Sequence, residues 1–252
     1  MSEHVRVQSE SGVLAITLAR PERRNAITVA MYQTLADAIE SAAADSSIRL
    51  ITICGEGQDF AAGNDLADFL EAAPRLDEEI PVWRFLRALA TCETPLIAAV
   101  HGNCVGIGTT MLLHCDLVIA DATARFSMPF VDLGLVPEAA SSLLLPRIAG
   151  RRRAARYLLL CEVFGIDEAH EIGLVSHRVE QGELDQKLEE LVRGLLAKPP
   201  EALRQTQQLL RHAAREDILQ RMKMESSLFA ERLGSAEVKE AISAFFANRA
   251  SA

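Results

Sequence analysis

Two segments of the sequence combine small residues with a turn, and each could expose backbone N–H groups. Residues 60–66 (FAAGNDL) follow the apolar run 50–54, and residues 102–110 (GNCVGIGTT) follow the apolar run 96–100. Free N–H groups where a strand turns into a helix can bind an anion or a developing oxyanion. The same composition is also typical of ordinary strand-to-helix turns. Each segment alone therefore leaves both interpretations open.

The two segments are more informative as a pair. Both follow apolar strands expected in one sheet, at the carboxyl ends where open α/β sheets bind ligands. Two converging N–H donors stabilise an enolate or a tetrahedral oxyanion. The second segment is not a phosphate loop, because it lacks the Lys-Ser/Thr pair of a P-loop and the chain has no G-x-G-x-x-G.

Glu138 is the carboxylate whose surroundings could support proton transfer. It lies in residues 135–142 (LVPEAASS), among the apolar side chains of Val136, Ala139 and Ala140. Apolar surroundings raise the pKa of an acid toward that of a useful base. A Pro-Glu pair is also favourable at the start of a helix. Catalytic and structural roles are both open on these residues alone.

Other chemistry-bearing residues fit no further site. The chain has no G-x-S-x-G nucleophile elbow, and its six histidines show no metal-site spacing. We expect His101 at a strand end and His114 on a helix near Cys115. Asp65 and Asp116 are expected to cap or brace helix and strand ends.

Composition places the chain among globular proteins. Of 252 residues, 49% are hydrophobic and 24% charged, which excludes disorder and suits one large domain or one domain with an appendage. Five cysteines without C-x-x-C spacing indicate neither a disulfide framework nor a zinc ribbon. No apolar run is long enough to span a bilayer, and the first residues resemble no signal or transit peptide, so we expect a cytoplasmic protein.

The net charge of −9 opposes binding to nucleic acid, since phosphate neutralisation needs several cations on one face. The dense basic run 151–153, with Arg156, would wrap around a helix instead of forming a stripe. We therefore expect neither nucleic acid nor membrane as a partner.

Short apolar runs separated by helical patterns predict an α/β fold with a mostly parallel sheet. Strands are expected at 5–8, 13–18, 50–54, 96–100, 117–120 and 175–179. Helices are expected at 27–43, with Thr28 as N-cap, and at 108–115, 138–149, 151–160, 167–172, 183–196, 200–215 and 217–233. The Pro199-Pro200 pair separates an expected core, residues 1–197, from a helical segment, residues 198–252.

Several motifs in order along the chain resemble the crotonase (enoyl-CoA hydratase/isomerase) superfamily. They are residues 20–26 (RPERRNA), 60–66 (FAAGNDL), the run 95–116, 124–126 (ARF), 133–137 (LGLVP), 145–147 (LPR) and 173–175 (GLV). The resemblance implies a spiral of ββα units followed by C-terminal helices that build homotrimers, often paired into hexamers. It also implies acyl-CoA thioester substrates and an enolate held by two backbone N–H groups, those of Ala62 and Ile107.

The same resemblance implies the remaining site residues. Those expected to contact the substrate are Ala26, Gly63, Asn64, Asp65, Leu66, Gly106 and Phe130. Coenzyme A would enter as part of the substrate, and the chemistry would need no metal or redox cofactor.

Hydratases of the superfamily carry two glutamates, and this chain has Thr110 and Phe130 at those positions. Residues 63–66 (GNDL), 106–107 (GI), 128–130 (MPF) and 137–142 (PEAASS) are instead similar to the peroxisomal-type Δ3,Δ2-enoyl-CoA isomerases. In that branch the glutamate after Pro, here Glu138, is the catalytic base. The alternatives are a low-activity hydratase or another crotonase reaction using Glu138, and a CoA-thioester-binding protein in which Glu138 only caps a helix.

Overall fold

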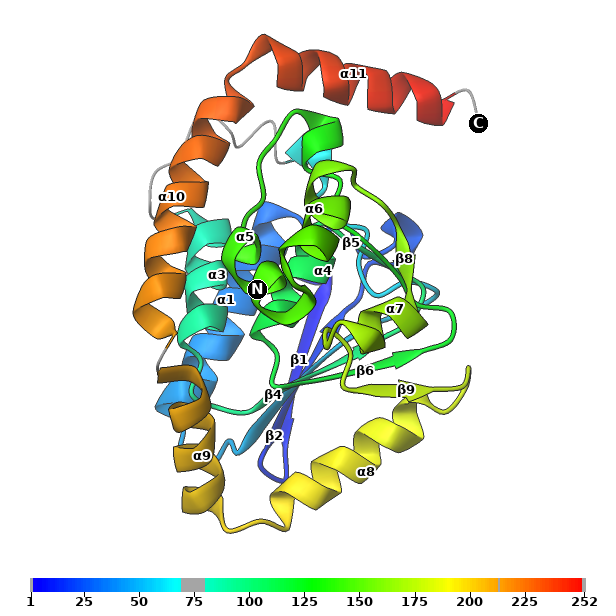
Figure 1. Ribbon diagram of the computed structural model, residues 1–252. Coiled ribbons are helices and arrows are strands. Elements are labelled where there is room, and N and C mark those ends of the chain that lie inside the picture. Colours follow the sequence, from blue (N-terminus) through cyan, green and yellow to red (C-terminus); the bar gives the residue numbers. More distant parts are fainter. Residues whose placement is uncertain (1, 69–79, 213, 251–252) are drawn as a thin grey trace.

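The computed structural model describes residues 2–68, 80–212 and 214–250, and its largest element is a six-stranded sheet (Figure 1). Its strands are β1 (Val5–Glu10), β2 (Val13–Leu18), β3 (Leu50–Gly55), β4 (Leu96–Val100), β6 (Leu117–Asp121) and β9 (His177–Val179), in the spatial order β1-β2-β3-β4-β6-β9. β1 is antiparallel to β2, and the other neighbours are parallel. The predicted α/β sheet is confirmed.

The central strands read as continuous apolar runs because both of their faces are covered. Every residue of β4 (LIAAV) is buried, as are the first four residues of β3. Strand β2, nearer the edge, alternates buried and half-buried side chains. Packing on both faces thus places β3 and β4 in the core, with their carboxyl ends leading into the two loops singled out above.

A second sheet joins three short strands, β5 (Asn103–Val105), β7 (Arg125–Ser127) and β8 (Phe164–Gly165). Strand β5 follows β4 and strand β7 follows β6, so the chain repeatedly passes from the large sheet to the small one. Gly102 makes the first of these passages possible. Its φ is +57°, and a Cβ there would lie 1.9 Å from the carbonyl oxygen of Gln58. These short strands were not predicted.

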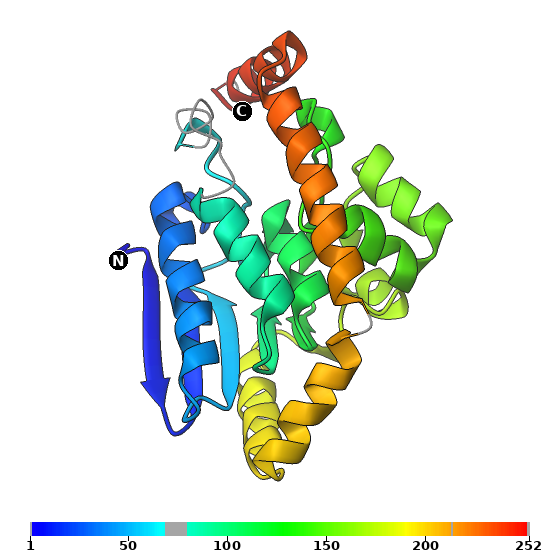
Figure 2. The same ribbon diagram turned by 90° about the vertical axis from the view of Figure 1, so that its left-hand side faces the viewer.

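Helices α1 (Val29–Ala44) and α3 (Pro81–Thr91) pack against each other beside the large sheet (Figure 2). As predicted, Thr28 caps α1, accepting a hydrogen bond from the Met31 N–H at 3.3 Å. The rings of Tyr32 and Phe85 lie 5.5 Å apart between the two helices. Helix α3 was missed by the sequence analysis, although its buried residues recur at helical spacing.

The helices after residue 105 follow the predicted ranges with two differences. They are α4 (Ile107–Thr110), η3 (Met111–His114), α5 (Ser141–Ala149), α6 (Arg151–Leu159), α7 (Ile166–Glu171) and α8 (Leu184–Leu196), with the 3₁₀ turn η4 (Val131–Leu133). Another 3₁₀ turn, η1 (Pro21–Arg23), precedes α1. The predicted helix 108–115 is divided between α4 and η3. Helix α5 begins three residues later than predicted, because Ala139 and Ala140 adopt left-handed φ angles of +58° and +55°.

The C-terminal helices are α9 (Pro200–His212), α10 (Arg215–Leu233) and α11 (Ala236–Ala250), the last of them not predicted. A break between helices falls at Pro199-Pro200, since α8 ends at Leu196 and α9 begins at Pro200, and the division into a core and a helical segment stays a prediction. Helix α10 runs alongside α3 and α5 (Figures 1 and 2), with Trp83 edge-on to Phe229. Among the described residues, no helix has the length and apolar character needed to cross a membrane.

Candidate active site

Several backbone N–H groups of the loop after β3 are committed to other parts of the chain. The Ala61 N–H donates to the carbonyl of Asn103 at 3.1 Å, and the Ala62 N–H donates to the carbonyl of Arg24 at 2.9 Å. The prediction that Ala62 supplies a free oxyanion donor is therefore wrong. Its N–H is used to fasten the loop to the segment after η1.

Asn64 presents an uncommitted N–H in the described part of this loop. The Ile27 N–H donates to the Gly63 carbonyl at 2.8 Å, and the Asp65 N–H donates to the Ile27 carbonyl at 2.9 Å. In such a parallel bridge, the N–H of the central residue points to the opposite side. No described residue accepts a hydrogen bond from the Asn64 N–H. The donor thus lies two residues beyond the predicted one.

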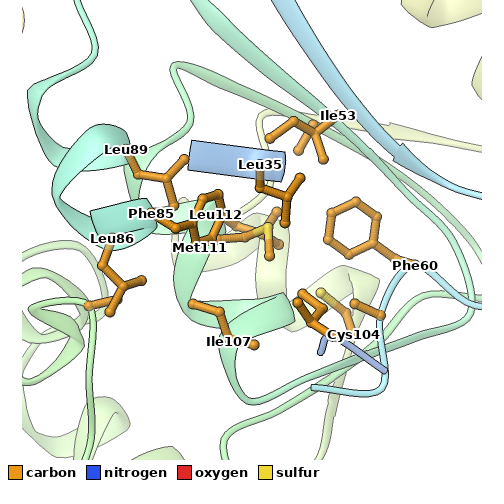
Figure 3. Packing of buried hydrophobic residues seen from close by; sticks show 14 of the residues in the cluster. Leu35, Ile53, Phe60, Phe85, Leu86, Leu89, Cys104, Ile107, Met111 and Leu112 are labelled. Atoms are coloured by element: carbon orange, nitrogen blue, oxygen red, sulfur yellow. The ribbon is translucent and has the colours of Figure 1, made fainter. Parts of the chain in front are cut away.

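The loop after β5 leaves the Ile107 N–H available. The Gly106 N–H donates to the Ser127 carbonyl at 2.8 Å, and the Gly106 carbonyl accepts from Thr109 and Thr110. Ile107 is the first residue of α4, where an N–H has no intrahelical acceptor, and the described residues offer it none. Its side chain, 1% exposed, packs into the hydrophobic core with Cys104 (Figure 3), which anchors the loop.

The two loops touch at their glycines. A Cβ on Gly106 would lie 4.0 Å from the Gly63 Cα, and a Cβ on Gly63 would lie 3.0 Å from the Val105 carbonyl oxygen. Both glycines have positive φ, +86° at Gly63 and +55° at Gly106. Asn64 and Ile107 each follow one of these contacting glycines, so two uncommitted N–H donors come from adjacent turns. This arrangement can stabilise negative charge on one oxygen.

Glu138 is a buried carboxylate, 3% exposed, with one oxygen engaged and one free. Its Oε1 accepts a hydrogen bond from the hydroxyl of Thr110, and its Oε2 has no partner in the described part of the chain. The pKa of Glu138 is raised to about 8: burial is the largest cause, the Thr110 hydrogen bond opposes the rise, and the nearby Glu225 carboxylate adds to it. Near neutral pH this group can both take and return a proton.

Local structure excludes a helix-capping role for Glu138. It lies three residues before α5, separated from it by the left-handed residues Ala139 and Ala140. The carboxylate makes no hydrogen bond to a described backbone N–H, and its engaged oxygen meets Thr110 instead. The burial of this acid is thus not explained by the start of a helix.

Two polar side chains whose contacts the sequence did not predict, those of Tyr32 and Thr110, bind Asn64 and Glu138. Tyr32, buried on α1, donates its hydroxyl to the Asn64 Oδ1 at 2.5 Å, and burial together with the charge of Glu138 raises its pKa well above the ordinary value. Thr110 was expected only to occupy a position where hydratases carry an acid, whereas its hydroxyl donates a hydrogen bond to Glu138. Tyr32 gave no sequence signal, because its helix reads as an ordinary amphipathic one.

Ala26, Asp65, Leu66 and Phe130 are the other residues predicted to bind the substrate. Arg20 Nη1 donates to the Ala26 carbonyl at 3.0 Å and to Asp65 Oδ2 at 2.8 Å, joining the two loops that contain them. Leu66 begins the short helical turn after Asp65 and is half-buried. Phe130 is buried in the core, where its carbonyl accepts two N–H groups from the turn that follows. Their contacts with substrate stay predictions.

The residues predicted to be structural have structural partners. Asp65 accepts from the Asp68 N–H at 3.4 Å, and Asp116 accepts from the Leu96 N–H at 2.8 Å. His101 contacts the Gly57 carbonyl at a strand end. His114, buried on η3, hydrogen-bonds the Ala139 carbonyl at 2.7 Å, and burial lowers its pKa to about 4. Within the described ranges, no group of three or more His, Cys, Asp or Glu could hold a metal ion.

Replacing Thr110 by valine is expected to shift the pH dependence of turnover to higher pH. The hydroxyl lowers the pKa of Glu138, so its removal raises that pKa above about 8 and leaves less ionised base at neutral pH. The measurement is turnover against pH, with Thr110→Ser as the control because it retains the hydroxyl. If the acid limb of the pH profile of turnover is the same in Thr110→Val as in the wild type, the hydrogen bond from Thr110 to Glu138 does not set the pKa of the base.

Comparison with known proteins places the chain in a family. The family model described as "Enoyl-CoA hydratase/isomerase" matches residues 8–251, almost the whole chain. The protein belongs to this family, the crotonase superfamily. Its structure matches a solved enoyl-CoA hydratase/isomerase from Pseudoalteromonas atlantica T6c with a TM-score of 0.92 and 39% identity, covering 98% of both chains. The fold class predicted from the sequence is confirmed.

The characterised relatives are named for several different reactions. The chain is 34% identical to the 1,2-epoxyphenylacetyl-CoA isomerase of Escherichia coli (strain K12), over 99% of this chain and 97% of the relative. It is 34% identical to the 2,3-dehydroadipyl-CoA hydratase of the same organism, with the same coverage. It is 31% identical to enoyl-CoA delta isomerase 2 of Rattus norvegicus, over 97% of this chain and 63% of that one. Because these identities are similar, the reaction must be argued from the site.

Proposed function

We propose that this protein is a Δ3,Δ2-enoyl-CoA isomerase, which converts 3-enoyl-CoA into 2-trans-enoyl-CoA. The observation that carries the proposal is the state of Glu138: a buried carboxylate with a raised pKa, one oxygen held by Thr110 and the other free. A 1,3-shift of a double bond needs one base that can take a proton and give it back. A group with a pKa of about 8 is suited to both steps near neutral pH.

The proposed reaction begins when Glu138 Oε2 removes a proton from C2 of the 3-enoyl thioester. The electron pair of the C2–H bond moves toward the thioester carbonyl, whose oxygen becomes negative. The N–H groups of Asn64 and Ile107 donate to that oxygen, Asn64 taking the place first predicted for Ala62. Glu138 then returns the proton to C4, and the double bond moves to C2–C3. Atoms and electrons balance within the substrate and one carboxyl group.

Hydration is the less favoured alternative because this site does not provide the two acids that activate water in the hydratase branch. Thr110 holds one of those positions and donates to Glu138, so its hydroxyl is already used. Phe130 holds the other with an apolar, buried ring. The predicted absence of a metal or redox cofactor fits this proposal, since amides and one carboxylate suffice, with coenzyme A as part of the substrate.

The proposal is tested by incubating the protein separately with 3-hexenoyl-CoA and 2-hexenoyl-CoA and resolving the products by chromatography and mass. Conversion of the first into its isomer without a change of mass supports the isomerase. Addition of the mass of water to the second supports a hydratase. No turnover of either, with retained thioester binding, supports a non-catalytic binding protein.

We also propose that residues 198–252 form an oligomerisation segment, giving a homotrimer or hexamer. Helix α9 leaves Leu209 and Leu210 exposed, at 78% and 76%, and α10 leaves Met224 and Leu228 at least half exposed. Apolar patches of this kind mark interaction surfaces. Light scattering at micromolar concentration is expected to give a trimer or its double, and the double variant Leu209→Asp/Leu210→Asp a smaller species. A monodisperse wild-type monomer would contradict the proposal.

A further inference from the structure

A strained turn follows the proposed base directly. Ala139 and Ala140 have φ angles of +58° and +55°, a region that residues with a Cβ rarely adopt. Two such residues in succession persist only where the surrounding contacts determine them. The contacts that hold this turn therefore decide where Glu138 lies.

Glu225 supplies three hydrogen bonds to this turn and the start of α5, although it lies on α10, 87 positions after Glu138. It is 5% exposed, and its Oε2 accepts a hydrogen bond from the Ala140 N–H at 2.6 Å. Its Oε1 accepts from the Ser142 N–H at 3.0 Å and from the Ser142 hydroxyl at 2.5 Å. One carboxylate thus binds the backbone of the turn at Ala140 and the backbone of helix α5 at Ser142.

Two further hydrogen bonds fix the turn from other sides. The His114 Nε2 donates to the Ala139 carbonyl at 2.7 Å, since a carbonyl oxygen can only accept. The Ser141 hydroxyl donates to the Glu138 carbonyl at 2.6 Å. Among the described side chains that hydrogen-bond this turn, Glu225 is the one carboxylate.

We propose that Glu225 is a positioning residue for the reaction, holding the Ala139–Ala140 turn in the conformation that keeps the Glu138 carboxylate beside Thr110 with Oε2 free. This inference rests on the proposed role of Glu138 as the base. Glu225 touches no reacting atom, and it acts through the backbone of the turn.

The charge of Glu225 adds a second effect on Glu138. Burial raises the pKa of Glu225 itself, whereas the hydrogen bonds from Ser142 and Ala140 and the charge of Arg221 oppose that rise. The other titratable and charged groups around this pair are Tyr32 on α1, His114 on η3 and Arg221 on α10. A negative Glu225 raises the pKa of Glu138, so it strengthens the base that it positions.

The variant Glu225→Gln separates this role from simple packing. Glutamine has nearly the same shape but only one acceptor oxygen, so it cannot bind both Ala140 and Ser142 as the carboxylate does. We expect turnover of 3-hexenoyl-CoA to fall about 10²-fold, as for a displacement of about 1 Å at a reacting group, with KM nearly unchanged. We also expect the acid limb of the pH profile to move to lower pH. The control is Glu231→Gln, an exposed carboxylate on the same helix.

A readout independent of turnover keeps this proposal distinct from the proposed function. The titration of Glu138 can be followed by ¹³C NMR of labelled glutamate carboxyls, assigned by the signal lost in Glu138→Gln. We expect its pKa to fall below about 8 in Glu225→Gln, while burial still holds it above the ordinary value, and to stay unchanged in Glu231→Gln. Inactive wild-type protein would refute the isomerase, whereas this titration would still test the positioning role.

Two results would overturn the proposal. One is a Glu225→Gln variant in which the titration of Glu138 matches the wild type. The other is a Glu225→Gln variant whose turnover falls only because less of the protein is folded. In that case thermal unfolding shows the loss of folded protein, and the activity per folded site equals that of the wild type.

Discussion

Turnover of 3-hexenoyl-CoA is expected to fall by about 10²–10⁴-fold in the variant Glu138→Gln, the loss typical of removing a positioned proton-transfer group. Glutamine is nearly isosteric with glutamate and still accepts a hydrogen bond from Thr110, so the fold and the affinity for the thioester should be retained. The measurement is turnover together with the dissociation constant of a saturated acyl-CoA. Equal isomerase rates in the variant and the wild type would refute Glu138 as the base.

The stability of the same variant provides a check on the protonation state of Glu138. The folded protein binds a proton at Glu138 up to pH about 8, whereas the unfolded chain releases it near the ordinary glutamate pKa of 4.5. The folded state therefore holds more protons between these values, and wild-type stability falls as pH rises through this window. Glutamine does not titrate, so the Tm of Glu138→Gln relative to the wild type should increase from pH 5 to pH 8. A constant difference would contradict the raised pKa.

Replacing Gly106 by alanine is expected to lower turnover by about 10²–10³-fold, the effect of losing one oxyanion donor. The space around Gly106 is open, since the nearest atom to an added Cβ is the Gly63 Cα at 4.0 Å. Its φ of +55° and ψ of −119°, however, suit glycine alone. Alanine would turn the backbone toward another conformation and redirect the Ile107 N–H. The loss should appear mainly in kcat.

The matched control for this variant is Gly173→Ala. Gly173 also has a positive φ, +81°, and no atom within 4 Å of an added Cβ, but it lies after α7, away from the two loops. It should show a loss of stability comparable to that of Gly106→Ala with wild-type turnover per folded site. Similar kcat values in the two variants would contradict the assignment of the Ile107 N–H.

The parts of the fold that the sequence predicted well are those determined by burial along one element. Strands β3 and β4 are apolar throughout because both faces are covered, and that pattern is visible in residues 50–54 and 96–100. Strands β5, β7 and β8, two or three residues long, exist through pairing with distant segments. So short a strand has no periodicity of its own to detect.

The site was predicted less completely, for a related reason. Ala62 and Asn64 belong to one loop of similar small residues, and which N–H is free depends on pairing with Arg24 and Ile27. The predicted helix start at Glu138 failed because the turn after it is held by Glu225, which is distant in the sequence. Local preference at Pro137-Glu138 favoured a helix, and these tertiary hydrogen bonds overrode it.

The most direct test of the central claim, that one buried base moves a proton from C2 to C4, is a single turnover of 3-hexenoyl-CoA carrying two deuterium atoms at C2. Glu138 is buried and its free oxygen has no hydrogen-bond partner among the described residues, so we expect slow exchange with solvent. If Glu138 carries the proton from C2 to C4, the product is 2-trans-hexenoyl-CoA with one deuterium at C2, and a measurable fraction of the second deuterium is found at C4. Isomerised product with no deuterium at C4, or product that has gained the mass of water, would contradict it.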